Sequence, residues 1–126
     1  MLDHIGIDVS DIVRSRAFYE AALEPLGYAV IEDLTGQPGA DPIVMFGIEG
    51  PEFVIAEDKA PGRGNHFAFR AETRAAVDAF HAAALKAGGR DNGGPGLRPN
   101  YGPTYYAAFV LDPDGFNIEA VCHVPE

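Results

Sequence analysis

The sequence predicts an α+β fold of two βαβββ modules, which form a curved, incompletely closed eight-stranded sheet with the helices outside. Two observations indicate this. When the chain is shifted by 62 positions against itself, segment 2–11 (LDHIGIDVSD) aligns with 64–73 (GNHFAFRAET), and 17–27 aligns with 79–89, without a gap. Each copy opens with alternating apolar and polar residues, typical of a half-buried strand, and continues into an amphipathic helix. We therefore place module one at about 1–58 and module two at about 64–126, in one domain.

The first module begins with a strand over 4–9, in which Ile5 and Ile7 alternate with polar or small residues. Side chains alternate between the two faces of a strand, so His4 points away from the apolar face. Ser10 or Asp11 can cap the helix that follows, and Pro25 ends it. Three further strands are expected at 27–34, 41–48 and 51–57.

The second module repeats this order, starting with a strand over 66–71. Phe67 and Phe69 form its apolar face, and His66 takes the opposite face. Thr73 or Glu72 can cap the helix, and a glycine pair ends it at 88–89. A weak strand at 88–92 and two strong ones at 104–112 and 116–122 follow, with 92–103 expected to be a loop.

Composition narrows the classes of function. The net charge of −10, from 19 acidic and 9 basic residues, argues against nucleic acid as a partner. No apolar run approaches the roughly 20 residues needed to cross a membrane. The single cysteine, Cys122, cannot form an internal disulfide, which suits the reducing cytoplasm. These features favour a cytoplasmic protein, whose negative charge either permits cationic ligands or forms an ordinary acidic surface.

Three polar side chains are expected on the inner face of the sheet. In the last strand Glu119 alternates with apolar residues and points to the side that already carries His4 and His66. Burying two imidazoles and a carboxylate is costly unless they have partners. Two histidines and one carboxylate suit one divalent transition metal (Zn, Ni, Mn, Fe or Co) and leave positions open for substrate.

Segments 3–23 and 105–121, the latter ending in the pattern DPDG-x-x-IE, resemble the vicinal oxygen chelate superfamily. This superfamily contains glyoxalase I, extradiol dioxygenases, and fosfomycin- and bleomycin-resistance proteins, and the resemblance covers essentially the whole chain. It implies that His4, His66 and Glu119 are the metal ligands. It also implies a metal that polarises oxygen atoms of the substrate, and a homodimer.

Departures from the family pattern separate its branches. Glyoxalase I has a fourth ligand on the last strand of the first module, where an ungapped comparison places Ala56; a one-residue bulge would bring Glu57 there instead. Ten residues before the last glutamate, extradiol dioxygenases and fosfomycin transferases have a tyrosine, whereas this chain has Phe109. Phe109 cannot transfer protons and would form an apolar wall. Bleomycin-resistance proteins need no metal ligands, so the presence of the three ligand residues in this chain argues against simple drug binding.

The sequence therefore predicts a metal-dependent, glyoxalase-like enzyme with lyase or isomerase chemistry. Glu119 is the candidate base as well as a ligand, and Tyr105, Phe109 and Arg70 are candidate substrate contacts. The alternatives are a metal-free ligand-binding protein, a ring-cleaving dioxygenase, and a structural module with a vestigial site. The expected loop contains Arg98, Asn100 and Tyr101. Two roles are open for it: a lid or rim of the site, or a solvent-exposed segment without a function in binding.

Overall fold

The computed structural model describes residues 4–39, 42–58 and 66–126. The first module contains β1 (Ile5–Val9), α1 (Ile12–Leu23), a 3-10 turn (Glu24–Leu26), β2 (Ala29–Asp33), β3 (Ile43–Gly47) and β4 (Phe53–Glu57). The second contains β5 (His66–Arg70), α2 (Arg74–Lys86), β6 (Arg90–Leu97), β7 (Tyr106–Leu111) and β8 (Asn117–Cys122). The order βαβββ, twice, is confirmed.

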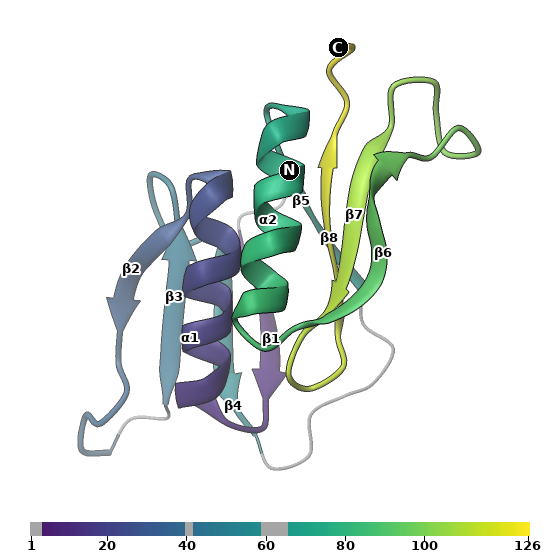
Figure 1. Ribbon diagram of the computed structural model, residues 1–126. Helices are drawn as coiled ribbons and strands as arrows, with labels where there is room; N and C mark the ends of the chain where they lie inside the picture. Colours follow the sequence, from purple (N-terminus) through teal and green to yellow (C-terminus); the bar gives the residue numbers. More distant parts are fainter. Residues whose placement is uncertain (1–3, 40–41, 59–65) are drawn as a thin grey trace.

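Each module forms its own four-stranded mixed sheet, and the two sheets have the same topology. The strand orders are β1-β4-β3-β2 and β5-β8-β7-β6. In both sheets the first strand pairs in parallel with the last, and the other pairs are antiparallel. Both β1 and β5 therefore lie at a sheet edge. Figure 1 shows α1 and α2 side by side, each contacting strands of its own module.

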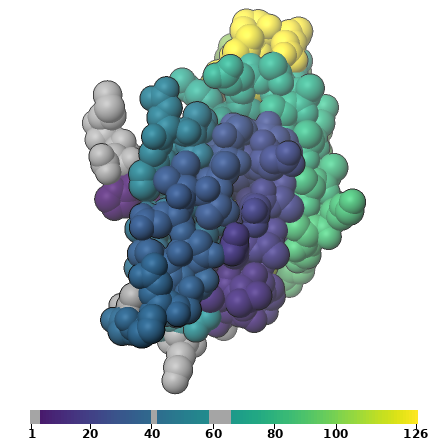
Figure 2. Space-filling view, turned by 90° about the vertical axis from the view of Figure 1, so that its left-hand side faces the viewer, coloured from purple at the N-terminus to yellow at the C-terminus, as the bar shows by residue number. Residues whose placement is uncertain are grey.

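The core lies where the helices cover the sheets. Complete burial of one large apolar side chain stabilises a fold by roughly 1.5–3 kcal/mol. The largest buried side chains of this core are aromatic: Phe18, Tyr19, Phe46, Phe53, Phe80 and Phe116. The two modules share this core, since the rings of Phe53 and Phe69 meet edge to face at 5.1 Å. Figure 2 shows the first module, in purple and blue, directly against the green part of the second.

Both helix starts are capped by one of the two residues expected from the sequence. Asp11 accepts a hydrogen bond from the backbone N–H of Arg14 (3.0 Å), and Thr73 accepts one from Ala76 (3.1 Å). The α1 terminus has a second carboxylate acceptor, because Glu57 accepts from the N–H of Ile12 at 2.9 Å. An N-cap of this kind stabilises a helix by about 0.5–2 kcal/mol.

The expected loop over 92–103 is wrong in its first half, because β6 extends to Leu97 and pairs with β7. The glycines and the proline of this segment leave no alternation of apolar and polar residues by which the sequence would indicate a strand. The register shifts twice, between Asp91 and Gly93 and between Gly93 and Gly96, and Gly93 has a φ of 145°. An edge strand tolerates such bulges and a proline, because one side of it needs no ladder partner.

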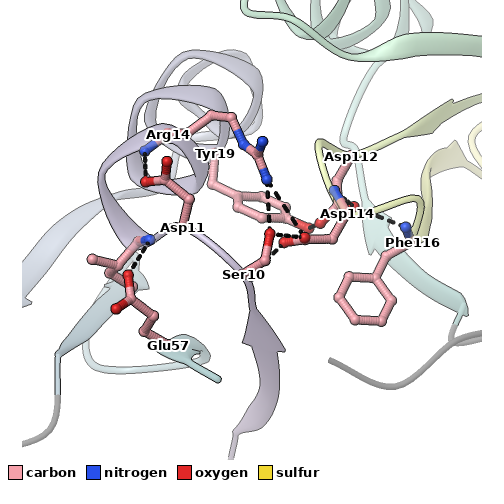
Figure 3. A network of polar contacts seen from close by, with 9 residues as sticks. Ser10, Asp11, Arg14, Tyr19, Glu57, Asp112, Asp114 and Phe116 are labelled. Atoms are coloured by element: carbon pink, nitrogen blue, oxygen red, sulfur yellow. Dashed lines mark hydrogen bonds and ion pairs between the residues drawn. The ribbon is translucent and has the colours of Figure 1, made fainter. Parts of the chain in front are cut away.

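The turn 112–115 holds the two modules together (Figure 3). Asp112 is buried and accepts a hydrogen bond from the hydroxyl of Tyr19 in α1, at 2.6 Å. Asp114 accepts hydrogen bonds from the backbone N–H (2.8 Å) and the hydroxyl of Ser10 and pairs with Arg14 at 3.5 Å. The DPDG pattern therefore fixes the C-terminal end of β1 beside the start of β8.

Candidate functional site

The centre of the candidate site is Glu119, in the middle of β8. The register places Ala68 of β5 on one side of it and Phe109 of β7 on the other. Glu119 is only 2% exposed, yet both carboxylate oxygens have a partner. Oε2 lies 3.0 Å from Nε2 of His66, and Oε1 accepts a hydrogen bond from the Tyr105 hydroxyl at 2.5 Å. The alternation of the last strand thus places Glu119 and His66 on one inner face, as expected.

His66 begins β5 and is held by the backbone of β8. Its Nδ1 lies 3.0 Å from the carbonyl oxygen of Asn117. A carbonyl only accepts, so Nδ1 carries a hydrogen and Nε2 faces the carboxylate of Glu119. The 3.0 Å between Nε2 and the carboxylate oxygen is bridged either by a proton, on the ring or on the carboxyl group, or by a cation. A histidine whose other nitrogen donates to a backbone carbonyl is the usual arrangement for a metal ligand, so this donor pair fits a divalent metal.

A cavity of about 580 Å³ opens in front of this pair, lined by His66, Asn100, Tyr101, Tyr105, Phe109, Asn117 and Glu119. The ring of Phe109 stacks with that of His66, 6.2 Å away and tilted by 27°, which supplies the expected apolar wall. Burial, together with the hydrogen bond to Glu119, raises the pKa of Tyr105 to about 12. The Tyr105 hydroxyl therefore keeps its proton at neutral pH and acts as a donor to the carboxylate.

A second cavity of about 310 Å³ continues from the first. It is lined by Asn92, Gly93, Arg98, Asn100, Tyr101, Phe109 and Asn117, four of which also line the first cavity. Asn92 and Arg98 belong to this second part alone. Asn92 is not among the residues expected at the site; it lies where the expected weak strand 88–92 meets the expected loop 92–103.

His4 does not join this pair in a group of three metal-binding side chains within the described residues. It directly precedes β1, and the far end of β1 is tied to the turn that adjoins the start of β8. At about 3.3 Å per residue, His4 is roughly 20 Å from that turn. Figure 1 shows β1 and β8 running in opposite directions. Within the described residues, no three His, Cys, Asp or Glu side chains form a group able to hold a metal. His4 as a ligand stays a prediction.

Arg70, a predicted substrate contact, lies on the same face of β5 as His66 but four residues further along the strand. It lines two other cavities, of about 460 and 540 Å³, whose walls include the C-terminal segment in one case and, in the other, the turn after α1 together with the start of α2. Glu119 lines neither of them. A role for Arg70 in substrate binding also stays a prediction.

The register corrects the position of the fourth glyoxalase I ligand. Gly6 and Ala68 are equivalent in the two modules, and Ala68 pairs with Glu119 whereas Gly6 pairs with Val54. Val54, and not Ala56, is therefore the counterpart of Glu119. Glu57 is occupied at the start of α1. The first module of the described chain offers no carboxylate at this place, because the two last strands are offset by three residues relative to the sequence repeat.

The Glyoxalase/Bleomycin resistance protein/Dioxygenase superfamily model matches residues 1–120, and the chain belongs to this superfamily. A glyoxalase/bleomycin resistance protein from Albidiferax ferrireducens T118 is 29% identical, with a TM-score of 0.80 and 99% of both chains covered. A putative glyoxalase from Bacillus halodurans is 28% identical, with a TM-score of 0.67 over 97% of this chain and 95% of that one. A comparison with curated proteins finds no match.

Another similar structure is a mutant of the fosfomycin resistance protein FosX from Listeria monocytogenes. It is 21% identical, with a TM-score of 0.73 over 97% of this chain and 91% of that one, which is a likeness of fold. No helix in the described part of the chain is long and apolar enough to span a membrane.

Proposed function

We propose that this chain is a metal-dependent enzyme of the glyoxalase type, which carries out lyase or isomerase chemistry on a small oxygenated substrate. The observation that carries the proposal is the pairing of a buried carboxylate, Glu119, with Nε2 of His66 at 3.0 Å in an open cavity. The fold supports it, since members of the superfamily commonly bind a divalent metal. The FosX mutant structure contains Mn(II) and 1S,2S-dihydroxypropylphosphonic acid, a ligand with two neighbouring hydroxyl groups.

His66 and Glu119 would hold a divalent transition metal through an imidazole nitrogen and a carboxylate oxygen. When bound, such a metal acts as a Lewis acid that polarises oxygen atoms of a substrate. Asn117 holds the imidazole in the tautomer that leaves Nε2 free. Tyr105 fixes the second carboxylate oxygen by its hydrogen bond, so Glu119 cannot rotate away from His66.

Glu119 is also the proposed base. A buried carboxylate at the wall of a cavity can take a proton from carbon next to a substrate carbonyl and return it to the neighbouring carbon. Phe109 shields one side of the cavity from water, which strengthens the electrostatic interactions inside it. The net result of such a transfer is an isomerisation, with no change in the atoms of the substrate.

His4 would complete the site from a second copy of the chain. His4 and His66 are equivalent in the sequence repeat, but the contacts of the turn 112–115 keep them apart within one chain. The edges of β1 and β5 are both unpaired within the described residues, so a two-fold dimer can bring β1 of one copy to β5 of the other. Members of the superfamily often form dimers.

Metal analysis tests the first part of the proposal. We expect about one divalent metal per chain in the purified protein and a loss of at least tenfold in metal affinity for His66→Ala. The control is His81→Ala, because His81 pairs with Asp91 at 2.9 Å, away from the cavity. Metal-free protein that binds ligand equally well in wild type and His66→Ala would support the alternative, a ligand-binding protein without catalysis.

Mixing two inactive variants tests the shared site. If His4 acts across the dimer, mixed dimers of His4→Ala and His66→Ala chains contain one intact site and one doubly altered site. Random exchange then restores roughly a quarter of the wild-type metal content, because half of the dimers are mixed. No recovery, with exchange verified by mass spectrometry, would mean that each chain forms its site alone or that His4 is no ligand.

A further inference from the structure

We propose that the cavity next to Glu119 contains a subsite for an anionic group of the substrate, a carboxylate or a phosphonate, and that Arg98 binds it. This inference rests on the proposed function, because it names the class of substrate for the same site. The cavity that Arg98 lines shares the side chains of Phe109 and Asn117 with the cavity that contains Glu119. One small molecule can therefore occupy both.

The position of Arg98 is fixed before any ligand arrives. Its backbone N–H donates to the carbonyl of Tyr105 at 2.8 Å, and its own carbonyl accepts from the N–H of Tyr101 at 2.9 Å. The guanidinium lies over the ring of Phe109, 5.4 Å from its centroid, and Nη2 donates to the carbonyl of Gly94 at 2.7 Å. Little side-chain freedom remains to be lost on binding.

The glycines of β6 make room for this guanidinium. A Cβ atom added at Gly93 would lie 3.3 Å from Nη2 of Arg98 and 3.1 Å from the ring of Phe109. One added at Gly96 would lie 3.1 Å from Nη1. All three distances are shorter than ordinary contacts of a Cβ atom. The glycine-rich composition of β6, which weakens it as a strand, is thus matched to the space that Arg98 occupies.

The charge of Arg98 has no counterpart in the described part of the chain. None of the ion pairs found there includes Arg98, although the chain carries 19 acidic residues against 9 basic ones. A guanidinium has five N–H donors, and backbone carbonyls take only some of them. The other polar side chains of this cavity are Tyr101, with its hydroxyl, and the amides of Asn92, Asn100 and Asn117. Such a neutral, donor-rich setting suits an oxyanion.

Phe109 connects the two parts of the site. The guanidinium of Arg98 and the imidazole of His66 both lie against its ring, at 5.4 and 6.2 Å from the centroid. An anionic group at Arg98 would direct the rest of a short molecule toward His66 and Glu119. The expected substrate is therefore a small acid that carries further oxygen atoms, and not a neutral carbonyl compound.

Binding of three matched probes tests this subsite: phenylacetate, benzylphosphonate and the neutral phenylacetamide. Measured by calorimetry or NMR titration, at least one of the two anions should bind about tenfold or more tightly than the amide, because hydrogen bonds to charged groups are the stronger ones. The tighter of the two anions identifies the oxyanion. Arg98→Gln should abolish this preference, and Arg98→Lys should retain part of it.

Arg90→Gln is the matched control, since it removes a positive charge from the opposite end of the same strand and should leave the preference unchanged. Glu119→Gln separates this proposal from the proposed function, because it should remove metal binding but keep the preference for anions. Equal binding of anion and amide by the wild type would overturn the subsite. So would a preference that survives in folded Arg98→Gln and Arg98→Lys, or one lost equally in Arg90→Gln.

Discussion

At the scale of single residues, the site depends on how one buried carboxylate is satisfied. Glu119 has one partner for each oxygen, His66 for Oε2 and Tyr105 for Oε1. A buried carboxylate without partners is costly, so the two contacts both stabilise the fold and orient the carboxylate. The sequence repeat indicated His66, whereas the Tyr105 contact spans two strands and became visible only in the structure.

Tyr105→Phe should destabilise the protein by about 1–2 kcal/mol, because it removes the hydroxyl that donates to buried Glu119. Urea unfolding of the metal-free protein measures this. Tyr101→Phe is the control, since Tyr101 is 63% exposed and should change stability by no more than about 0.5 kcal/mol. Equal stability of the two variants would contradict the role given to the Tyr105 hydroxyl.

At the scale of the elements, helix starts and strand ends are where side chains take roles that the sequence pattern did not assign. Glu57 is the last residue of β4, and its carboxylate lies at the N-terminus of α1. A carboxylate at this place satisfies a free N–H and interacts favourably with the helix dipole. The 62-residue shift aligns Glu57 with Glu119, but in the structure Glu57 takes this different role at a helix start.

Glu57→Ala should therefore lower the free energy of unfolding by about 1 kcal/mol and leave the metal content unchanged. Chemical denaturation and elemental analysis of the same preparation give the two values. Glu32→Ala, an exposed change in β2, serves as the control for the loss of one negative charge. A fall in metal content with Glu57→Ala alone would restore Glu57 as a ligand.

The end of β3 offers a second test at this scale. A Cβ atom at Gly47 would lie 1.7 Å from the carbonyl oxygen of Gly50, which is too close for any side chain. Gly47→Ala should cost about 1–3 kcal/mol or more, measured by thermal unfolding, because the turn must move. Gly50→Ala has open space around the added methyl and should have little effect. Similar melting temperatures for both would show that the turn adapts freely.

At the scale of the whole molecule, the turn 112–115 decides how the modules meet. Its two aspartates bind Ser10 and Tyr19 from the first module, and the shared aromatic core supports the same arrangement. In this arrangement His4, His66 and Glu119 do not form one group within the described chain. The proposal that His4 acts from a second copy rests on this.

The pH dependence of stability tests this contact. Burial raises the pKa of Asp112 above its usual value of 3.8, so the folded chain keeps a proton that the unfolded chain has lost. Ionising Asp112 therefore costs folding free energy as the pH rises above about 4. Between pH 4 and 7 the free energy of unfolding of the wild type should therefore fall relative to that of Asp112→Asn, which has no carboxyl group to ionise.

Asp33→Asn is the control, because the pKa of Asp33 is shifted in the opposite direction and its pH dependence of stability should have the opposite sign. Hydrogen bonds from Thr35 lower the pKa of Asp33 below 3.8, so its contribution to stability is present above that value and is lost as the pH falls through the folded pKa. In the acid range, the free energy of unfolding of the wild type should therefore increase relative to that of Asp33→Asn as the pH rises. The same sign for both variants would contradict the assignment for Asp112.

The sequence by itself determined the two modules, the helices with their caps, and the inner faces of β5 and β8, because these depend on local alternation and short-range hydrogen bonds. It predicted only the start of β6, because the glycines and the proline of this strand obscure any alternation pattern. Only the tertiary structure decided that Val54 opposes Gly6, that Tyr105 reaches Glu119, and that His4 does not join His66 and Glu119 within the described chain. Strand register and module packing depend on long-range contacts such as that between Tyr19 and Asp112, which leave no periodic signal in the sequence.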